Sequence, residues 1–231
     1  MMALLEGAGI DPTGQRGYHI LWHVAQAGLI CLGPMDGKHQ TFVLLDEWVP
    51  ASASRRLSRE DATAELAGRY FTSHGPATLP DFAGWARLPM AAATAGLAAA
   101  SSTLAPERIG TKDYWMGTET ASRDVRDARG VHLLPGFDEY VLGYKDRGDI
   151  LAPEHAARIV PGKNGVFLPT IVVGGRIVGT WKRTLRRGAL DVTLHPFARL
   201  DAAEEGVAEA ARRYGDCIGL SVASIAVEDT R

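Results

Sequence analysis

Two adjacent carboxylates, Asp138 and Glu139, are the side chains of this sequence best suited to acid–base chemistry. They lie between Phe137 and Tyr140 in an otherwise apolar stretch, so we expect them to be largely buried. Buried carboxylates tend to have raised pKa values and to mark functional sites. Hydrolysis of a glycosidic bond, at a sugar or a nucleoside, needs a group that positions water and stabilises a cationic sugar. Asp138 is therefore a candidate catalytic residue; pairing with Arg147 or capping of a turn is the alternative.

Positive charge is concentrated between Val160 and Leu190. This segment contains six Lys and Arg residues and no Asp or Glu, although the net charge of the whole chain is −2. Local positive charge on a projecting hairpin indicates a polyanion as partner, here double-stranded DNA. The residues predicted to contact DNA are Lys163, Asn164, Arg176, Trp181, Lys182, Arg183, Arg186 and Arg187.

The basic segment has a second explanation. Exposed sheet edges often carry Lys or Arg because these charges prevent edge-to-edge aggregation. Six cations without an acid exceed what edge protection requires, so we adopt DNA contact as the interpretation. Trp181 is able to stack on a base or wedge into a groove, but a Trp beside a strand is also commonly part of the core.

Other chemistries lack the residues that they need. His19 and His23 form a pair at helical spacing without a third ligand nearby, so no metal is expected. Cys31 and Cys217 are isolated, which excludes a recognisable zinc motif and fits a reducing cytoplasm. No Walker A, GxGxxG or GxSxG pattern occurs, so neither a cofactor nor serine-hydrolase chemistry is expected. No apolar run approaches the roughly 20 residues of a membrane helix.

A β-meander is predicted to position the basic segment. The Gly174-Gly175 pair separates two β-rich runs, and adjacent glycines favour a two-residue hairpin turn because both can adopt positive φ. A third strand follows over Ala189–Leu194, and a helix is expected from Asp201 to Tyr214. Residues 217–227 are apolar and expected to be buried.

Two helix–hairpin units are predicted before the meander. In the first, a helix from Gly17 to Ala27 precedes two strands, and its Tyr18 and Trp22 are expected to be mostly buried. In the second, three helices precede a hairpin, a pattern typical of a winged helix. Thr78 and Asp81 form a capping arrangement that predicts the start of its short middle helix. The predicted fold class is α+β, with tandem winged-helix units followed by an antiparallel β-rich C-terminal part. The predicted domains are a partial winged helix at 1–50, a winged helix at 58–118, and a β-meander with a C-terminal helix at 130–231.

The helix predicted over Met90–Ala100 occupies the recognition position of the second unit. It contains no Lys, Arg, Asn or Gln, which readout of base edges in the major groove requires. We expect it to be a packing helix, and we expect DNA to be gripped by backbone and shape. A transcription regulator therefore ranks last among the candidate functions.

Four motifs of the chain are distinctive: RGYHILWHVAQAGLICLGP, HGPATLPDFAGWARLP, LLPGFDEYVLGYKDR and NGVFLPTIVVGGRIVGTW. In this order they closely resemble the AlkZ-like family of tandem winged-helix DNA glycosylases, from about Arg16 to Leu220. The resemblance implies excision of alkylated bases and interstrand crosslinks from DNA without a metal or organic cofactor. It also implies three winged helices plus a β-rich part whose hairpin reaches the minor groove.

The resemblance supplies no catalytic residue. The family's catalytic motif is a Gln-aliphatic-Gln or Gln-aliphatic-Asp triplet in its first winged helix, whereas Gln15, Gln26 and Gln40 lie in no such triplet. The chain is expected to begin where the second winged helix of the family begins. We therefore expect a DNA-binding relative that is catalytically incomplete.

Two alternatives stay open besides the regulator. An active glycosylase would use another residue, with Asp138 the best candidate. A protein-interaction or regulatory winged-helix module would show no salt-dependent DNA binding. A surface left uncovered by an absent first domain also leads us to expect a homodimer.

Overall fold

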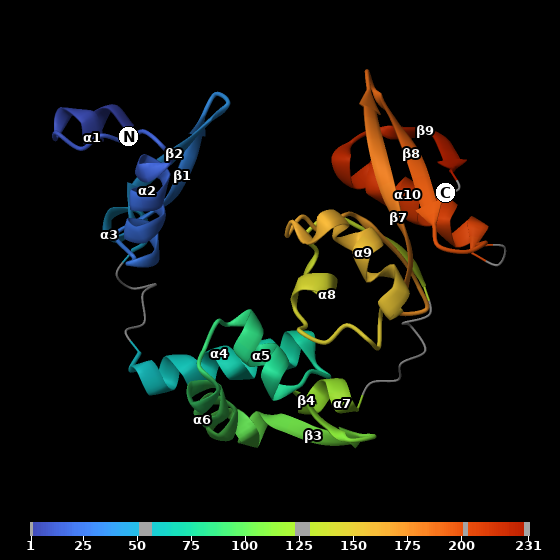
Figure 1. The fold of residues 1–231 in the computed structure, drawn as a ribbon, viewed down its shortest axis with the longest axis horizontal. Coiled ribbons are helices and arrows are strands. Elements are labelled where there is room, and N and C mark those ends of the chain that lie inside the picture. The colour runs from blue at the N-terminus through green and yellow to red at the C-terminus, as the bar shows by residue number, and fades with distance from the viewer. Residues whose placement is uncertain (1, 51–56, 123–129, 201–202, 229–231) are drawn as a thin grey trace. The chain divides into compact units, whose positions relative to one another are not determined.

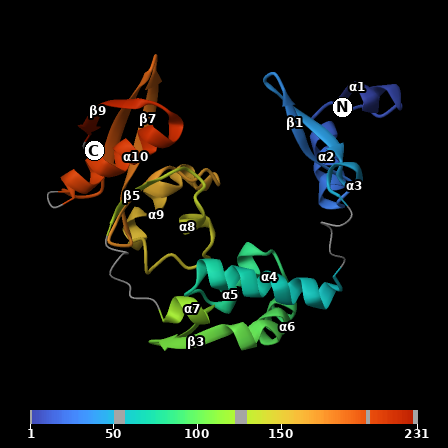
Figure 2. The same ribbon diagram turned by 180° about the vertical axis from the view of Figure 1, so that it is seen from behind.

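The structure, a computed structural model, describes residues 2–50, 57–122, 130–200 and 203–228. Helices and strands are mixed along the chain, so the fold class is α+β, as predicted (Figures 1 and 2). The chain divides into two compact units, Met1–Ser58 and Arg59–Arg231, which are described separately below.

The first unit is a small helix–hairpin assembly. Its elements are α1 (Met2–Gly7), α2 (Arg16–Gln26), β1 (Ile30–Asp36), β2 (His39–Leu44) and α3 (Leu45–Trp48). The prediction that Tyr18 and Trp22 are mostly buried was wrong, because they are 70% and 65% exposed. Only Gly17 and Leu21 of α2 are buried, and the helix face that carries Tyr18 and Trp22 is directed to solvent.

The second unit begins with a helical part closed by a hairpin. Its elements are α4 (Arg59–His74), α5 (Leu79–Trp85), α6 (Met90–Ala100), η2 (Ser101–Thr103), β3 (Leu104–Ile109), β4 (Lys112–Gly117) and α7 (Thr118–Ala121). Tyr70, Phe71 and Phe82 form its aromatic core, with ring centroids 5.1–5.5 Å apart. The small residues of α6 allow close packing, since a Cβ on Gly96 would lie 2.7 Å from the side chain of Thr63. In this structure α6 is a packing helix.

A five-stranded sheet dominates the rest of the second unit, in the order β5-β6-β7-β8-β9. Its strands are β5 (Val131–Leu134), β6 (Thr170–Val173), β7 (Arg176–Arg186), β8 (Ala189–Pro196) and β9 (Ser221–Val227), and α10 (Glu204–Ile218) covers one face. Short helices join β5 to β6: α8 (Glu139–Leu142), η4 (Pro153–His155), α9 (Ala156–Ile159) and η5 (Pro161–Lys163). Gly174 and Gly175 form the predicted turn with φ of 55° and 80°.

The C-terminal strand departs from the prediction in two ways. β9 pairs parallel to β8, so the sheet is mixed, because α10 carries the chain back across the sheet before β9 begins. Side chains of β9 that were expected to be buried are mostly exposed, since the strand lies at the sheet edge; Ile225 and Val227 are examples. The predicted helix start at Asp201 lies outside the described residues.

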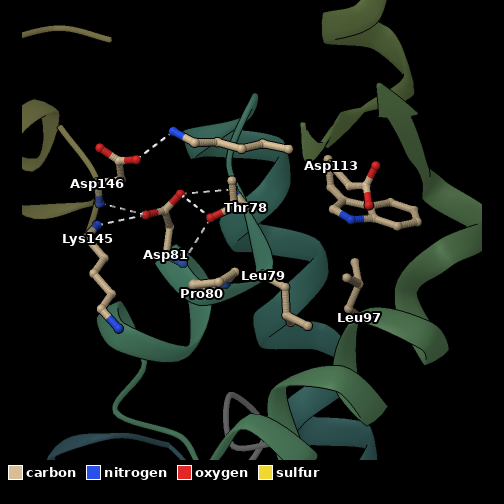
Figure 3. A pocket seen from close by; sticks show the side chains of 10 residues that line it. Thr78, Leu79, Pro80, Asp81, Leu97, Asp113, Lys145 and Asp146 are labelled. Atoms are coloured by element: carbon tan, nitrogen blue, oxygen red, sulfur yellow. Dashed lines mark hydrogen bonds and ion pairs between the residues drawn. The ribbon is translucent and has the colours of Figure 1, made fainter. Parts of the chain in front are cut away.

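Asp81 fastens the helical part of the second unit to the segment that follows β5. Its carboxylate accepts hydrogen bonds from the N–H (2.9 Å) and hydroxyl (2.6 Å) of Thr78, which forms the predicted capping box of α5. It also accepts from the backbone N–H groups of Lys145 (2.8 Å) and Asp146 (3.2 Å) (Figure 3). Each carboxylate oxygen therefore has two donors, although Asp81 is buried.

Two tyrosines reinforce this junction. The hydroxyl of Tyr70 donates to the carbonyl of Gly143 at 2.7 Å, and that of Tyr144 donates to the carbonyl of His74 at 2.6 Å. Burial raises the pKa of Tyr144 to about 12, and burial raises the pKa of Tyr70 as well. Both phenols therefore stay protonated and act as hydrogen-bond donors at neutral pH.

Candidate nucleic-acid interface

The basic hairpin is formed by β7 and β8 and projects beyond β5 and β6 (Figure 1). β6 pairs only with the first part of β7, up to Thr180, and the N–H of Trp181 then donates to the carbonyl of Pro169 at 3.1 Å. β8 pairs with β7 as far as Arg186. One edge of β7 from Lys182 onward is thus unpaired within the described part of the chain, and it carries the cations.

Four of the predicted DNA contacts gather at this end of the hairpin, and all four are exposed: Lys182, Arg183, Arg186 and Arg187. Side chains alternate between the two faces of a strand, so Lys182 and Arg186 point away from α10. Arg183 points toward α10, and its guanidinium carbon lies 5.7 Å from the centre of the Tyr214 ring. The hairpin therefore presents positive charge on both faces and at its tip.

One acid reduces this charge. Asp191 of β8 forms an ion pair with Arg186 and accepts a hydrogen bond from the hydroxyl of Ser224 at 2.6 Å. The bonds from Ser224 and Arg186 hold the pKa of Asp191 below its usual value. Asp191 follows the acid-free segment by one residue, and strand pairing brings it back beside Arg186. Lys182 and Arg187 have no ion-pair partner among the described residues.

Trp181 was predicted to contact DNA, but it belongs to the core. It is 4% exposed, its indole N–H donates to the carbonyl of Leu134 at 2.7 Å, and its ring packs edge-on against Tyr214. The burial follows from α10, which packs against this face of the sheet and forms one core cluster with Trp181.

Three further predicted contacts lie away from the tip. Arg176 begins β7, and ten residues of strand at about 3.3 Å each separate it from Arg186 by roughly 33 Å. Lys163 lines a different cavity, described below. The side-chain oxygen of Asn164 accepts from the N–H of Val166 at 2.9 Å and so forms a local turn. All three side chains are exposed, but the structure does not bring Arg176 into the tip cluster.

The two candidate carboxylates have structural partners and are not deeply buried. Asp138 is the N-cap of α8 and accepts from the N–H of Tyr140 at 2.8 Å, which is the capping role considered as an alternative. Glu139 accepts from the indole N–H of Trp85 at 3.0 Å and contacts the imidazole of His74 at 3.2 Å. The expectation of largely buried carboxylates was wrong, because this turn lies at the surface.

A cavity of about 770 Å³ opens beside Asp81, between α5, α6 and β4 (Figure 3). Lys112 at the rim of this cavity is bound to Asp146 at 2.5 Å, and none of the predicted DNA contacts lines the cavity.

Among the described residues no cluster of three His, Cys, Asp or Glu side chains is arranged to hold a metal ion. No described helix is both long and apolar enough to cross a membrane.

Comparison with known proteins gives the class of the chain. A solved structure, the Streptomyces sahachiroi DNA glycosylase AlkZ, superposes with a TM-score of 0.74 at 26% identity, over 91% of this chain and 57% of that one. The interstrand DNA cross-link repair glycosylase of Streptomyces sahachiroi is 28% identical over 183 residues, which are 71% of this chain and 45% of that protein. The fold is therefore that of a DNA glycosylase.

The particular family follows from the family model. The model described as DNA glycosylase AlkZ-like matches residues 3–217, and the chain belongs to this family. The chain spans about half the length of the relatives that it matches.

Proposed function

We propose that this chain binds double-stranded DNA through the β7–β8 hairpin and handles crosslinked DNA, as the name of one relative suggests, or alkylated DNA, as the resemblance of its motifs implies. The observation that carries the proposal is the exposed cluster of four cations on a hairpin with a free edge. Membership of a DNA glycosylase family supports it. In a cell with a reducing interior the protein would work in the cytoplasm, which its two free cysteines fit.

Winged-helix units are proposed as the framework of this binding. The first unit contributes α2 with the β1–β2 hairpin, and the second contributes three helices with the β3–β4 hairpin. The apolar α6 offers no donors or acceptors for base edges. Binding is therefore expected to depend on phosphates and DNA shape and to be insensitive to sequence.

We propose further that these 231 residues do not release bases by themselves, because no Gln-aliphatic-Gln or Gln-aliphatic-Asp triplet occurs in them. The test is a base-release assay on alkylated and on crosslinked duplexes at protein concentrations that saturate DNA binding. We expect binding without release. Release above background, abolished by Asp138→Asn, would instead make the chain an active glycosylase; Asn is the matched variant because it also caps helices well.

The alternative function, protein interaction, is supported by the first unit. Of the seventeen large apolar side chains that are exposed in the described residues, nine lie in this unit, which holds only two of the twenty-eight buried hydrophobic residues. Exposed apolar surface of this extent is typical of a protein–protein interaction site.

We propose a second copy of the chain as the partner that binds this surface. Light scattering should give twice 24.8 kDa for the wild type and the single mass for Tyr18→Ser/Trp22→Ser; a monomeric wild type would contradict this.

A further inference from the structure

A second cavity in the C-terminal part combines apolar walls with uncompensated positive charge. Its volume is about 600 Å³, and residues from α8, α9 and the connecting loops line it. Three cations are among the lining residues: Lys145, Arg147 and Lys163. The one acid in the lining, Asp146, is bound by Lys112 at 2.5 Å and by the N–H of Gly148 at 2.9 Å. The cavity is therefore suited to an anion that also has an apolar portion.

Arg147 is the best-placed cation for such a ligand. Its Nε donates to the carbonyl of Val141 at 2.6 Å, and its guanidinium carbon lies 5.2 Å from the centre of the Phe167 ring. No carboxylate forms an ion pair with it in the described chain, and burial lowers the pKa of this arginine. A half-buried cation without a directly paired carboxylate is costly, and the charge of Asp81 offsets only part of the effect of burial on the pKa of Arg147; an external anion beside the guanidinium would offset more.

An exposed aromatic ring stands beside this cavity. Phe137 is 55% exposed, although its φ of +60° lies in the left-handed region that a bulky residue rarely adopts. Its ring centre lies 6.2 Å from that of Phe167 at an interplanar angle of 58°. Lys163 also has a positive φ, of 53°, so two of the four non-glycine residues with positive φ in the described part of the chain belong to this region.

The neighbours of Phe137 hold it in this conformation. A Cβ on Gly136 would lie 2.8 Å from the carbonyl oxygen of Phe167, so the loop is pressed against that segment. Asp138, on the other side, is fixed as the cap of α8. Strained residues that the surrounding structure over-determines cluster at ligand-binding sites. The strain here keeps an aromatic side chain in solvent beside a basic cavity.

We propose that this region is a subsite for one unpaired nucleotide, with its base stacked on Phe137 and its phosphate held by Arg147 and Lys163. Aromatic platforms beside a basic groove bind bases through their π faces, whatever the sequence. The subsite rests on the proposed DNA binding and extends it, because the hairpin would hold paired DNA and this site an unpaired residue. The nucleotide would come from single-stranded or distorted DNA, or from the free nucleotide pool.

The test compares fluorescence anisotropy of a fully paired duplex, the same duplex with one unpaired nucleotide, and the single strand. We expect the wild type to prefer the two unpaired substrates by about tenfold, as one stacked base provides. Phe137→Asn should remove the preference and leave binding of the paired duplex unchanged, since Asn tolerates positive φ. Val227→Asn, which replaces an exposed apolar side chain of β9 outside the cavity, is the matched control and should behave as the wild type.

The outcomes separate this inference from the function proposed above. Equal wild-type affinity for all three substrates together with no binding of dAMP, or a preference retained in Phe137→Asn, would overturn the subsite while duplex binding stands. If the wild type does not bind the fully paired duplex but binds the single strand, and if this binding depends on Phe137, the hairpin proposal is overturned and the subsite is supported. Calorimetry with dAMP identifies the source: binding of dAMP that Phe137→Asn abolishes, without any oligonucleotide preference, supports a free nucleotide as ligand.

Discussion

Reversing two charges at the hairpin tip is expected to weaken binding to an undamaged duplex on the order of 10–100-fold at low salt. The variant Lys182→Glu/Arg187→Glu changes two cations of this cluster that, in the described structure, have neither the ion pair of Arg186 nor the aromatic contact of Arg183. Both side chains are exposed, and neither packs against the core, so the sheet should remain intact. Fluorescence anisotropy of a labelled duplex measures the effect directly.

A variant with the same change in net charge controls for the overall repulsion of DNA. Arg59→Glu/Arg69→Glu reverses two exposed cations on α4, outside the hairpin. We expect it to weaken binding much less than the tip variant. Equal weakening by both variants would show that net charge, and no particular surface, governs the binding, and the hairpin would lose its assigned role.

Replacing Asp81 by Ala is expected to lower the free energy of unfolding of the second unit by about 3 kcal/mol or more. The carboxylate accepts from four donors in two segments, Thr78 and residues 145–146. Alanine would leave the part-buried backbone N–H groups of Thr78, Lys145 and Asp146 without this acceptor, and an unsatisfied group costs about 1–3 kcal/mol when it is fully buried. Urea unfolding followed by tryptophan fluorescence measures the loss.

Two further variants test whether the loss of the Asp81 acceptor oxygens causes the loss of stability. Asp81→Asn should be intermediate, because an amide retains one acceptor oxygen and turns an NH₂ group toward the other donors. Asp113→Ala should change the stability by about 0.5 kcal/mol or less, since its pairing with Arg108 at 3.0 Å is largely exposed to solvent. A loss below about 1 kcal/mol for Asp81→Ala would contradict the assignment of Asp81 as the junction between the two segments.

Local signals predicted much of the fold. The Gly174-Gly175 turn, the Thr78–Asp81 capping box and the helix Met90–Ala100 each depend on residues close in sequence, and the structure has all three. Long-range placement could not be obtained in this way. The parallel pairing of β9 depends on where α10 returns the chain, which no local pattern specifies.

The same distinction applies to the candidate site. Charge counting identified Lys182, Arg183, Arg186 and Arg187, because they are neighbours in one hairpin. It missed Asp191, which strand pairing places beside Arg186. For Trp181, weighed as a DNA contact and as a core residue, the structure has the core position, because the sheet and α10 enclose it. Arg147 and Phe137 had no signal of their own, since their arrangement arises only when α8 and the loop before β6 meet.

The most direct test of the central claim is the salt dependence of duplex binding by the wild type. Contacts with phosphates release counterions, so the logarithm of the association constant should fall linearly with the logarithm of salt concentration, with a slope of about −0.9 per contact. We predict such a slope, and a slope smaller by about 2 in magnitude for Lys182→Glu/Arg187→Glu. No binding at low salt, or binding that salt leaves unchanged, would contradict the proposal that this hairpin is a DNA-binding surface.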